Sequence, residues 1–162
     1  KSSLGPDSRL ELVQAHAGVA LEPVRALFME YAASLPVALD FQDFDAELAG
    51  LPGDYAPPGG RLLLARWDGL PAACAALRSF LPGDGEMKRM FVRPVFRGKG
   101  IARALAATII EDARAIGYRR LLLDTLPSMK EAQELYERLG FAEVPPYRFN
   151  PVAGARYMAL DL

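Results

Sequence analysis

The sequence has very few of the residues that build disulfides, metal clusters and catalytic triads. Its 162 residues include one cysteine, Cys74, and one histidine, His16. A single cysteine excludes an intrachain disulfide and a cysteine metal cluster, so we expect a reducing, cytoplasmic setting and no metal. A lone histidine likewise gives no support to a Ser-His triad or a histidine metal site.

Long hydrophobic runs are missing as well. No apolar stretch approaches the length of about 20 residues that a membrane-spanning helix needs, so we expect no membrane partner. Residues 1–8 lack the apolar centre of a signal peptide, and we interpret them as a flexible arm. Residues 9–162 are predicted to form a single domain, because a chain of this length that is 51% hydrophobic can bury one core.

An excess of one charge is absent overall but present locally. The 19 basic and 20 acidic side chains leave a net charge of -1, which does not favour nucleic acid as a partner. No acidic residue occurs between Met87 and Ile110, and no basic residue occurs between Ala26 and Gly60. The first segment suits an anionic ligand and the second a cationic one.

Hydrophobic periodicity and turn residues predict an α/β (α+β) protein. Strands are expected at 9–14, 61–67, 72–79, 86–92 and 120–125, helices at 23–34, 44–48, 101–116 and about 132–139, and a final hairpin within 147–162. A capping box is expected at Ser128–Glu131, at the start of the last helix. This order predicts a mixed sheet flanked by helices.

The segment Arg97-Gly98-Lys99-Gly100 joins a predicted strand to a predicted helix and is typical of a phosphate-binding loop. Glycines let the backbone approach an anion, and the first amides of the helix lack intrahelical acceptors. The spacing fits neither a P-loop nor a dinucleotide-binding fingerprint.

Arg97, Gly100 and Ala102 occupy the three defining positions of the Arg/Gln-x-x-Gly-x-Gly/Ala signature, and in this the chain resembles the GNAT superfamily of acyl-CoA-dependent N-acetyltransferases. Residues 86–94 resemble the fourth strand of that family, and residues 132–141 resemble its last helix and following turn. The resemblance implies a mixed, mostly antiparallel sheet with splayed central parallel strands, and acetyl-CoA as the acyl donor. Under this resemblance the cofactor-binding residues are Met90, Phe91 and Val92 for pantetheine, and Arg97, Gly98, Lys99, Gly100, Ile101 and Ala102 for pyrophosphate.

The same resemblance implies two catalytic residues. Tyr136 falls where the family places a general acid that protonates the leaving thiolate, and Glu86 falls where many relatives place the general base. Asp124, at the end of a predicted strand, is an alternative base. Met129 departs from the asparagine that many relatives carry at that position.

The acceptor is predicted to be a primary amine of a small molecule or peptide. Acidic residues between 40 and 54 overlap the helical segment that lines the acceptor cleft in similar proteins, so we hypothesise a cationic amine, although such a segment can also be a solvated surface. The candidate acceptor-binding residues are Tyr31, Asp40, Tyr55 and Tyr147.

The resulting interpretation is an N-acetyltransferase that moves an acetyl group directly from acetyl-CoA to an amine. The oligomeric state stays open between a monomer and a homodimer. One alternative is a non-catalytic acyl-CoA-binding regulatory module that has lost the chemistry. Another is a nucleic-acid-binding domain that uses the basic residues between 88 and 103, which the net charge disfavours.

Overall fold

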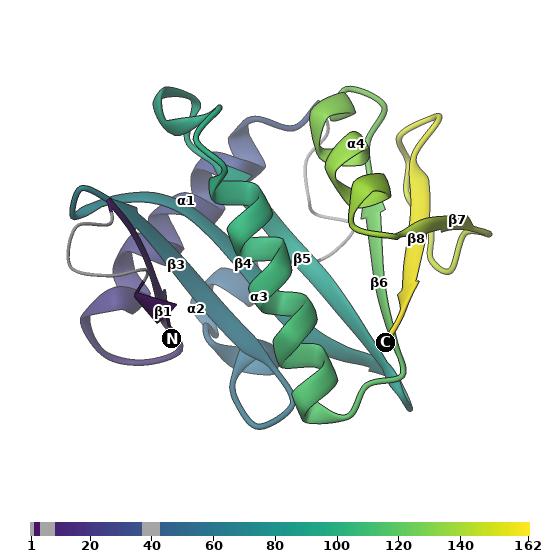
Figure 1. Cartoon of the computed structure of the whole chain (residues 1–162), viewed down its shortest axis with the longest axis horizontal. Coiled ribbons are helices and arrows are strands. Elements are labelled where there is room, and N and C mark those ends of the chain that lie inside the picture. Colours follow the sequence, from purple (N-terminus) through teal and green to yellow (C-terminus); the bar gives the residue numbers. More distant parts are fainter. Residues whose placement is uncertain (1, 4–8, 37–42) are drawn as a thin grey trace.

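The computed structural model describes residues 2–3, 9–36 and 43–162 and shows a mixed sheet covered by helices on both faces (Figure 1). The sheet has eight strands in the order β1-β2-β3-β4-β5-β6-β8-β7. These are β1 (Ser2–Ser3), β2 (Leu10–Gln14), β3 (Arg61–Trp67), β4 (Leu70–Leu81), β5 (Asp84–Val92), β6 (Arg120–Thr125), β7 (Ala142–Val144) and β8 (Arg156–Asp161). The predicted fold class is confirmed.

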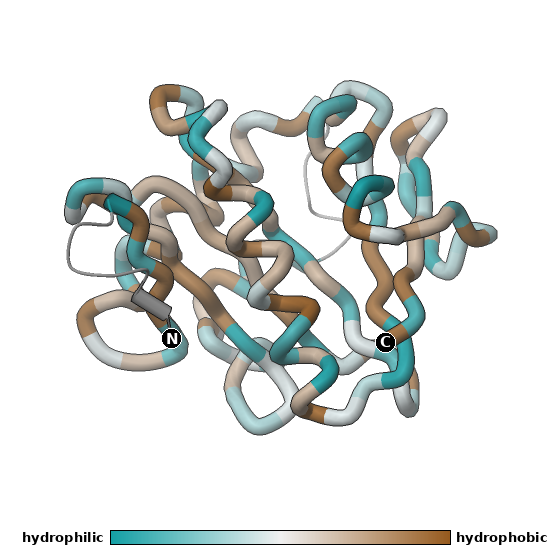
Figure 2. The backbone as a smooth tube through the Cα atoms, viewed as in Figure 1, coloured by the Kyte–Doolittle hydropathy of each residue, from teal (hydrophilic) through white to brown (hydrophobic). Residues whose placement is uncertain are grey.

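The helices α1 (Leu21–Ala33) and α2 (Phe44–Ala49) lie on one face of the sheet, and α3 (Ile101–Ile116) and α4 (Lys130–Arg138) lie on the other (Figure 1). Each pair covers its own core. Leu105 and Ile109 of α3 pack on one core, whereas Leu27 and Phe28 of α1 pack on the second. Hydrophobic residues are frequent along the central strands (Figure 2). Side chains on a strand therefore fall on the α1 face or on the α3 face according to their alternation.

Strands β5 and β6 run parallel but stay paired over three positions only, from Asp84 to Glu86 on β5. Beyond Glu86 the two strands separate, with α4 beside the widening gap (Figure 1). The other strand pairs described are antiparallel. The edge of β5 that faces this gap therefore continues past its last β6 partner, as expected for splayed central strands.

A bulge interrupts the pairing of β5 with β4. Cys74 lies opposite Phe91 and Ala76 lies opposite Lys88, so β5 contains one extra residue between these pairs. Arg89 at this point has a φ of 60°, which is uncommon for a residue with a side chain. The bulge changes which face of the sheet the following side chains occupy.

The central elements match the sequence prediction closely. The turn at Asp68-Gly69 joins β3 and β4, and both residues have positive φ, 51° and 82°, as a tight hairpin requires. Helix α3 ends where Gly117, with a φ of 108°, provides its left-handed C-terminal residue.

Two predictions at the C-terminal end are wrong. The final hairpin pairs β7 with β8 rather than two arms within 147–162, because Pro145 and Pro146 cannot donate to a strand ladder and the chain from 145 to 155 forms a loop. The capping box at Ser128–Glu131 is also absent, since α4 begins at Lys130 after a turn closed by the Met129 amide and no side chain caps it.

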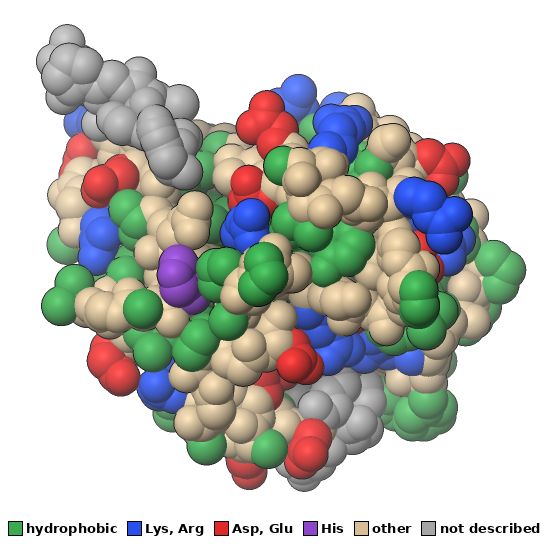
Figure 3. Space-filling model, turned by 90° about the horizontal axis from the view of Figure 1, so that it is seen from below, with side chains coloured by type: hydrophobic (Ala, Val, Ile, Leu, Met, Phe, Trp, Pro, Cys, Tyr) green, Lys and Arg blue, Asp and Glu red, His purple; other side chains and the backbone are tan. Residues whose placement is uncertain are grey.

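Within the described residues, none of the helices is both long enough and apolar enough to span a bilayer. On the face drawn in Figure 3, acidic and basic side chains are interspersed with hydrophobic ones.

Candidate active site

A pocket opens where β5 and β6 separate. Its empty volume, counted out to the open mouth, is about 640 Å³. It is lined by Tyr31, Leu35, Met87, Lys88, Arg89, Met90, Leu123, Asp124, Thr125, Leu126, Met129, Tyr136, Asn150 and Val152. The pocket therefore draws on α1, both splayed strands, α4 and the loop 145–155.

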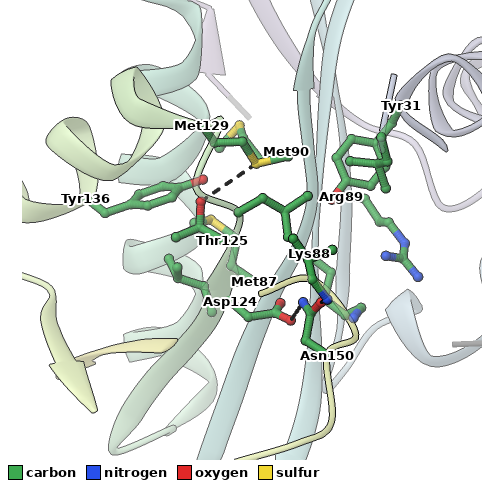
Figure 4. Close-up of a pocket in the computed structure, with 14 residues that line it drawn as sticks. Tyr31, Met87, Lys88, Arg89, Met90, Asp124, Thr125, Met129, Tyr136 and Asn150 are labelled. Carbon is green, nitrogen blue, oxygen red and sulfur yellow. Dashed lines mark hydrogen bonds between the residues drawn. The ribbon is translucent and has the colours of Figure 1, made fainter. Parts of the chain in front are cut away.

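The lining side chains divide between two sides (Figure 4). Met90 and Tyr136 belong to the core beneath α3, whereas Lys88 lies opposite Ala76, a residue of the core beneath α1. Asp124 follows Leu123 of the α3 core and so alternates to the α1 face. One side of the pocket is therefore formed largely by methionines and a tyrosine, and the other carries the charged groups.

Tyr136 enters the pocket from α4 and points its hydroxyl group inward (Figure 4). The helix ends in a Schellman arrangement, in which the Phe141 amide donates to the Tyr136 carbonyl over 3.0 Å and Gly140 has a φ of 104°. Phe141 packs on the Tyr136 ring with centroids 5.7 Å apart. Burial raises the pKa of the Tyr136 phenol, so the phenol keeps its proton at neutral pH and can act as a donor.

The predicted phosphate loop leads from the end of β5 into α3. Gly98 and Gly100 both have a φ of 81°, and a side chain at either position would meet no neighbouring atom within 4 Å, so the loop is open on its outer side. No side chain caps the first turn of α3, which leaves its amides available to an anion. Lys99 lies over the Trp67 ring, and Arg97 donates to the Val92 carbonyl over 2.9 Å. These residues fit a pyrophosphate group.

Glu86 is fully buried and bound on several sides. Its Oε1 atom accepts from the Arg78 Nε atom at 3.1 Å and from an Arg148 nitrogen at 2.6 Å. Its Oε2 atom accepts from the Tyr147 hydroxyl at 2.9 Å. Glu86 is not among the residues that line the pocket. It ties the loop 145–155 to the centre of the sheet.

Lys88 and Asp124 line the pocket and lie close to Asn150 (Figure 4). Burial lowers the pKa of the Lys88 amine from 10.5 to about 8, and the nearby carboxylates of Glu86 and Asp124 oppose that shift. Asp124 accepts a hydrogen bond from the Asn150 amide at 3.3 Å. A charged amine, a carboxylate and an amide therefore meet at one end of the pocket.

The Arg89 side chain forms an ion pair with Glu47. Its guanidinium donates to both carboxylate oxygens of Glu47 in α2, at 2.8 and 2.7 Å, and is only 3% exposed. It also lies over the rings of Tyr31 and Phe44. This pair fastens α2 to the bulge in β5 and neutralises the Arg89 charge.

The predicted acceptor residues are dispersed. Tyr31 lines the pocket, but Tyr55 is buried in the α1 core against Phe28 and Tyr147 donates to Glu86. Asp40 lies outside the described residues. Of the predicted cofactor residues, Met90 lines the pocket and Phe91 packs against Tyr31 on the opposite face.

The lining residues that sequence reasoning did not assign to the pocket include Lys88, Thr125, Asn150 and Val152. Thr125 is the last residue of β6, which ends at the pocket, so the strand pattern in the sequence could have placed it there. Asn150 and Val152 belong to the loop 145–155, and nothing in the sequence indicated which residues of this loop line the pocket.

The structure is that of an α/β protein with a pocket between splayed parallel strands and a nearby helix start whose amides could hold an anion. The chain belongs to the Acetyltransferase (GNAT) family, whose pattern it matches over residues 23–141. An uncharacterized N-acetyltransferase of Schizosaccharomyces pombe is 38% identical over 144 residues, which cover 88% of each chain.

Solved structures of acetyltransferases share the fold. One from Streptococcus agalactiae has a TM-score of 0.73 at 21% identity and covers 95% of this chain and 99% of its own. A second, from Salmonella typhimurium and solved with its cofactor acetyl-CoA, has a TM-score of 0.64 at 19% identity over 95% of this chain and 94% of its own. The family match and the Schizosaccharomyces pombe relative give no support to a non-catalytic acyl-CoA-binding module.

Proposed function

We propose that this protein is an acetyl-CoA-dependent N-acetyltransferase that transfers the acetyl group directly to a primary amine bound in the pocket between β5 and β6. The observation that carries the proposal is the arrangement of three features: an uncapped α3 start after the glycine-rich loop, a β5 edge that continues past its last β6 partner, and a buried tyrosine in the pocket. Membership of the acetyltransferase family supports the reaction class and the donor.

The two sides of the pocket suit the two reactants. The loop Arg97–Gly100 and the first turn of α3 would hold the pyrophosphate, and the β5 backbone from Met90 to Val92 would pair with the pantetheine arm. Acetyl-CoA supplies a thioester whose carbonyl carbon accepts the amine. The amine would approach from the α1 face, where Asp124 lies.

Tyr136 is proposed to donate its phenolic proton to the departing thiolate, because the phenol is protonated at neutral pH and its hydroxyl points into the pocket. Asp124 is proposed to accept the proton from the amine, because it is the carboxylate among the pocket-lining residues described. The prediction that Glu86 is the base stays a prediction, and its contacts favour a positioning role for the loop 145–155.

The test is acetyl-CoA turnover, followed as free thiol, with Tyr136→Phe beside the parent protein. We expect kcat to fall by roughly 10²-fold or more at unchanged acetyl-CoA affinity, because one general acid contributes about 10²- to 10⁴-fold. Tyr118→Phe is the matched control, since that hydroxyl donates to the Gly59 carbonyl away from the pocket.

An unchanged kcat in Tyr136→Phe would contradict the acid role alone. Failure of the parent protein to bind acetyl-CoA, measured by calorimetry, would contradict the proposed function as a whole.

A further inference from the structure

Asp124, the proposed base, is bound by a side chain from the loop 145–155. The Asn150 amide nitrogen donates to the Asp124 Oδ2 atom at 3.3 Å, and both residues line the pocket (Figure 4). Asp124 comes from β6, whereas Asn150 lies 26 positions later in the chain. The hydrogen bond therefore joins two separate parts of the pocket wall at the carboxylate that the reaction would use.

The Asn150 amide is bound at both of its ends, which determines its orientation. Its Oδ1 atom accepts from the Val152 backbone amide at 3.0 Å. An amide oxygen can only accept and an amide nitrogen can only donate, so this contact directs the nitrogen toward Asp124. A flipped amide would bring two donors together at Val152 and two acceptors together at Asp124. Asn150 therefore presents a fixed donor to the carboxylate.

The chain just before Asn150 is anchored next to Asp124. Tyr157 of β8 lies directly opposite Asp124 in the strand pair, so the two side chains share a face of the sheet. The Tyr157 hydroxyl donates to the Arg148 carbonyl at 2.8 Å, and the Arg148 side chain binds the buried Glu86 at 2.6 Å. Asn150 is therefore held in place by contacts other than its bond to Asp124.

We propose that Asn150 is a positioning residue for the transfer reaction: its amide holds the Asp124 carboxylate in the orientation that accepts the proton of the acceptor amine. The inference rests on the proposed function, because it takes Asp124 as the base. The amine nitrogen bonds to the acetyl carbon and gives its proton to Asp124, while the carbon–sulfur bond breaks and the thiolate takes its proton from Tyr136. Asn150 neither gains nor loses a proton. A carboxylate without a fixed partner turns about its side-chain bonds, so a fixed donor reduces the number of unproductive orientations.

The first experiment is a double-mutant cycle of Asn150→Ala and Asp124→Ala in the full chain. Rates are followed as free thiol with acetyl-CoA and, in turn, L-lysine, spermidine, 2-phenylethylamine and trialanine as acceptors. We expect Asn150→Ala to lower kcat by roughly 10-fold and to leave KM for acetyl-CoA unchanged, because the lost contact affects the base alone. In the Asp124→Ala background the same change should have no further effect, whereas a purely structural role would lower kcat equally in both backgrounds.

The second experiment uses Asn150→Asp, which keeps the shape of the side chain and the oxygen that accepts from Val152 but removes the donor toward Asp124. A residue that only shapes the loop would tolerate this change, because aspartate closes the same kind of turn. We expect instead a kcat at least as low as that of Asn150→Ala. Tyr118→Phe is again the control and should leave kcat unchanged, since that hydroxyl binds the Gly59 carbonyl away from the pocket.

A spectroscopic measurement tests the contact without a reaction. Asn150 is the one asparagine of the chain, so labelling of asparagine with ¹⁵N marks a single side-chain NH₂ group in the NMR spectrum. Its two proton signals should move in Asp124→Ala, because the carboxylate that accepts from this group is then lost. The signals should stay in place in Tyr118→Phe.

The outcomes separate the inference from the proposed function. An unchanged kcat in Asn150→Ala, an equal loss in both backgrounds, a parent-like kcat in Asn150→Asp or unmoved Asn150 signals in Asp124→Ala would each overturn the inference while the acetyltransferase assignment stands. An unchanged kcat in Asp124→Ala would overturn the base role and the inference with it. A parent protein that acetylates none of the acceptors would overturn the inference together with the proposed reaction.

Discussion

Replacing Lys88 by Met should make the protein more stable at neutral pH. Burial lowers the pKa of Lys88 from 10.5 to about 8 after the attraction of Glu86 and Asp124 has been included. At neutral pH the folded protein still carries this charge, and a difference of about 2.5 pKa units corresponds to an unfavourable free energy of about 3 kcal/mol. Met has a similar length and needs no solvation, so the variant should gain on the order of 1 to 3 kcal/mol.

The stability difference between Lys88→Met and the parent protein should decrease as the pH rises. Below about pH 8 Lys88 is charged in both states, and the unfavourable contribution is present in full. Between about pH 8 and 10.5 the folded protein releases the proton while the unfolded chain still binds it, so the stability of the parent protein rises with pH. The gap between variant and parent should therefore shrink from about 3 kcal/mol near pH 7 to about 1 kcal/mol near pH 10.

The assay is urea unfolding of the parent protein, Lys88→Met and the exposed control Lys130→Met between pH 7 and 10. The control should follow the parent protein at every pH. A Lys88→Met variant that is less stable than the parent near pH 7, or a gap that widens with pH, would refute the reasoning. A lysine that weakens the fold yet lines the pocket fits a role in ligand binding, where stability is commonly given up for function.

Two further changes probe the framework around the pocket. Glu86→Gln should lower the free energy of unfolding by about 3 kcal/mol, because Arg78 and Arg148 then lack a buried counter-charge. Hydrogen exchange in residues 145–155 should also become faster. Unchanged protection of that loop would show that Glu86 does not hold it in place. Gly60→Ala should cost about 1 to 3 kcal/mol, because its new Cβ would lie 2.4 Å from the Asp54 carbonyl oxygen, and an unchanged urea midpoint would contradict that close approach.

The central elements could be predicted from the sequence because the residue pattern of each one agrees with its place in the folded structure. The pattern in α3 repeats every three to four residues and ends at a glycine that the helix end needs. The strand after it, β6, has an apolar centre of three leucines at 121–123. The prediction of the final hairpin failed because β7 pairs with β8 through residues about 15 positions apart. Local turn residues do not determine such a pairing.

The candidate site was only partly predictable for a related reason. Tyr136 could be placed because it belongs to an amphipathic helix with a recognisable end. Glu86 could be placed on a strand, but its partners Arg148 and Tyr147 come from a loop more than 60 positions away. Carboxylates inside and outside a pocket lining look alike in a sequence, so the sequence alone could not place Asp124 in the lining and Glu86 outside it.

The bulge at Arg89 explains why the chemistry of β5 could not be assigned by alternation. A regular strand would place residues 88, 90 and 92 on one face. With the extra residue, Lys88 stays on the α1 face with Ala76, while Met90 turns to the α3 core. One short stretch of strand thus places a cation on the α1 side of the pocket and an apolar side chain on the α3 side. Arg89 holds this geometry at a positive φ through its ion pair with Glu47, so loss of that pair should disturb both sides of the pocket together.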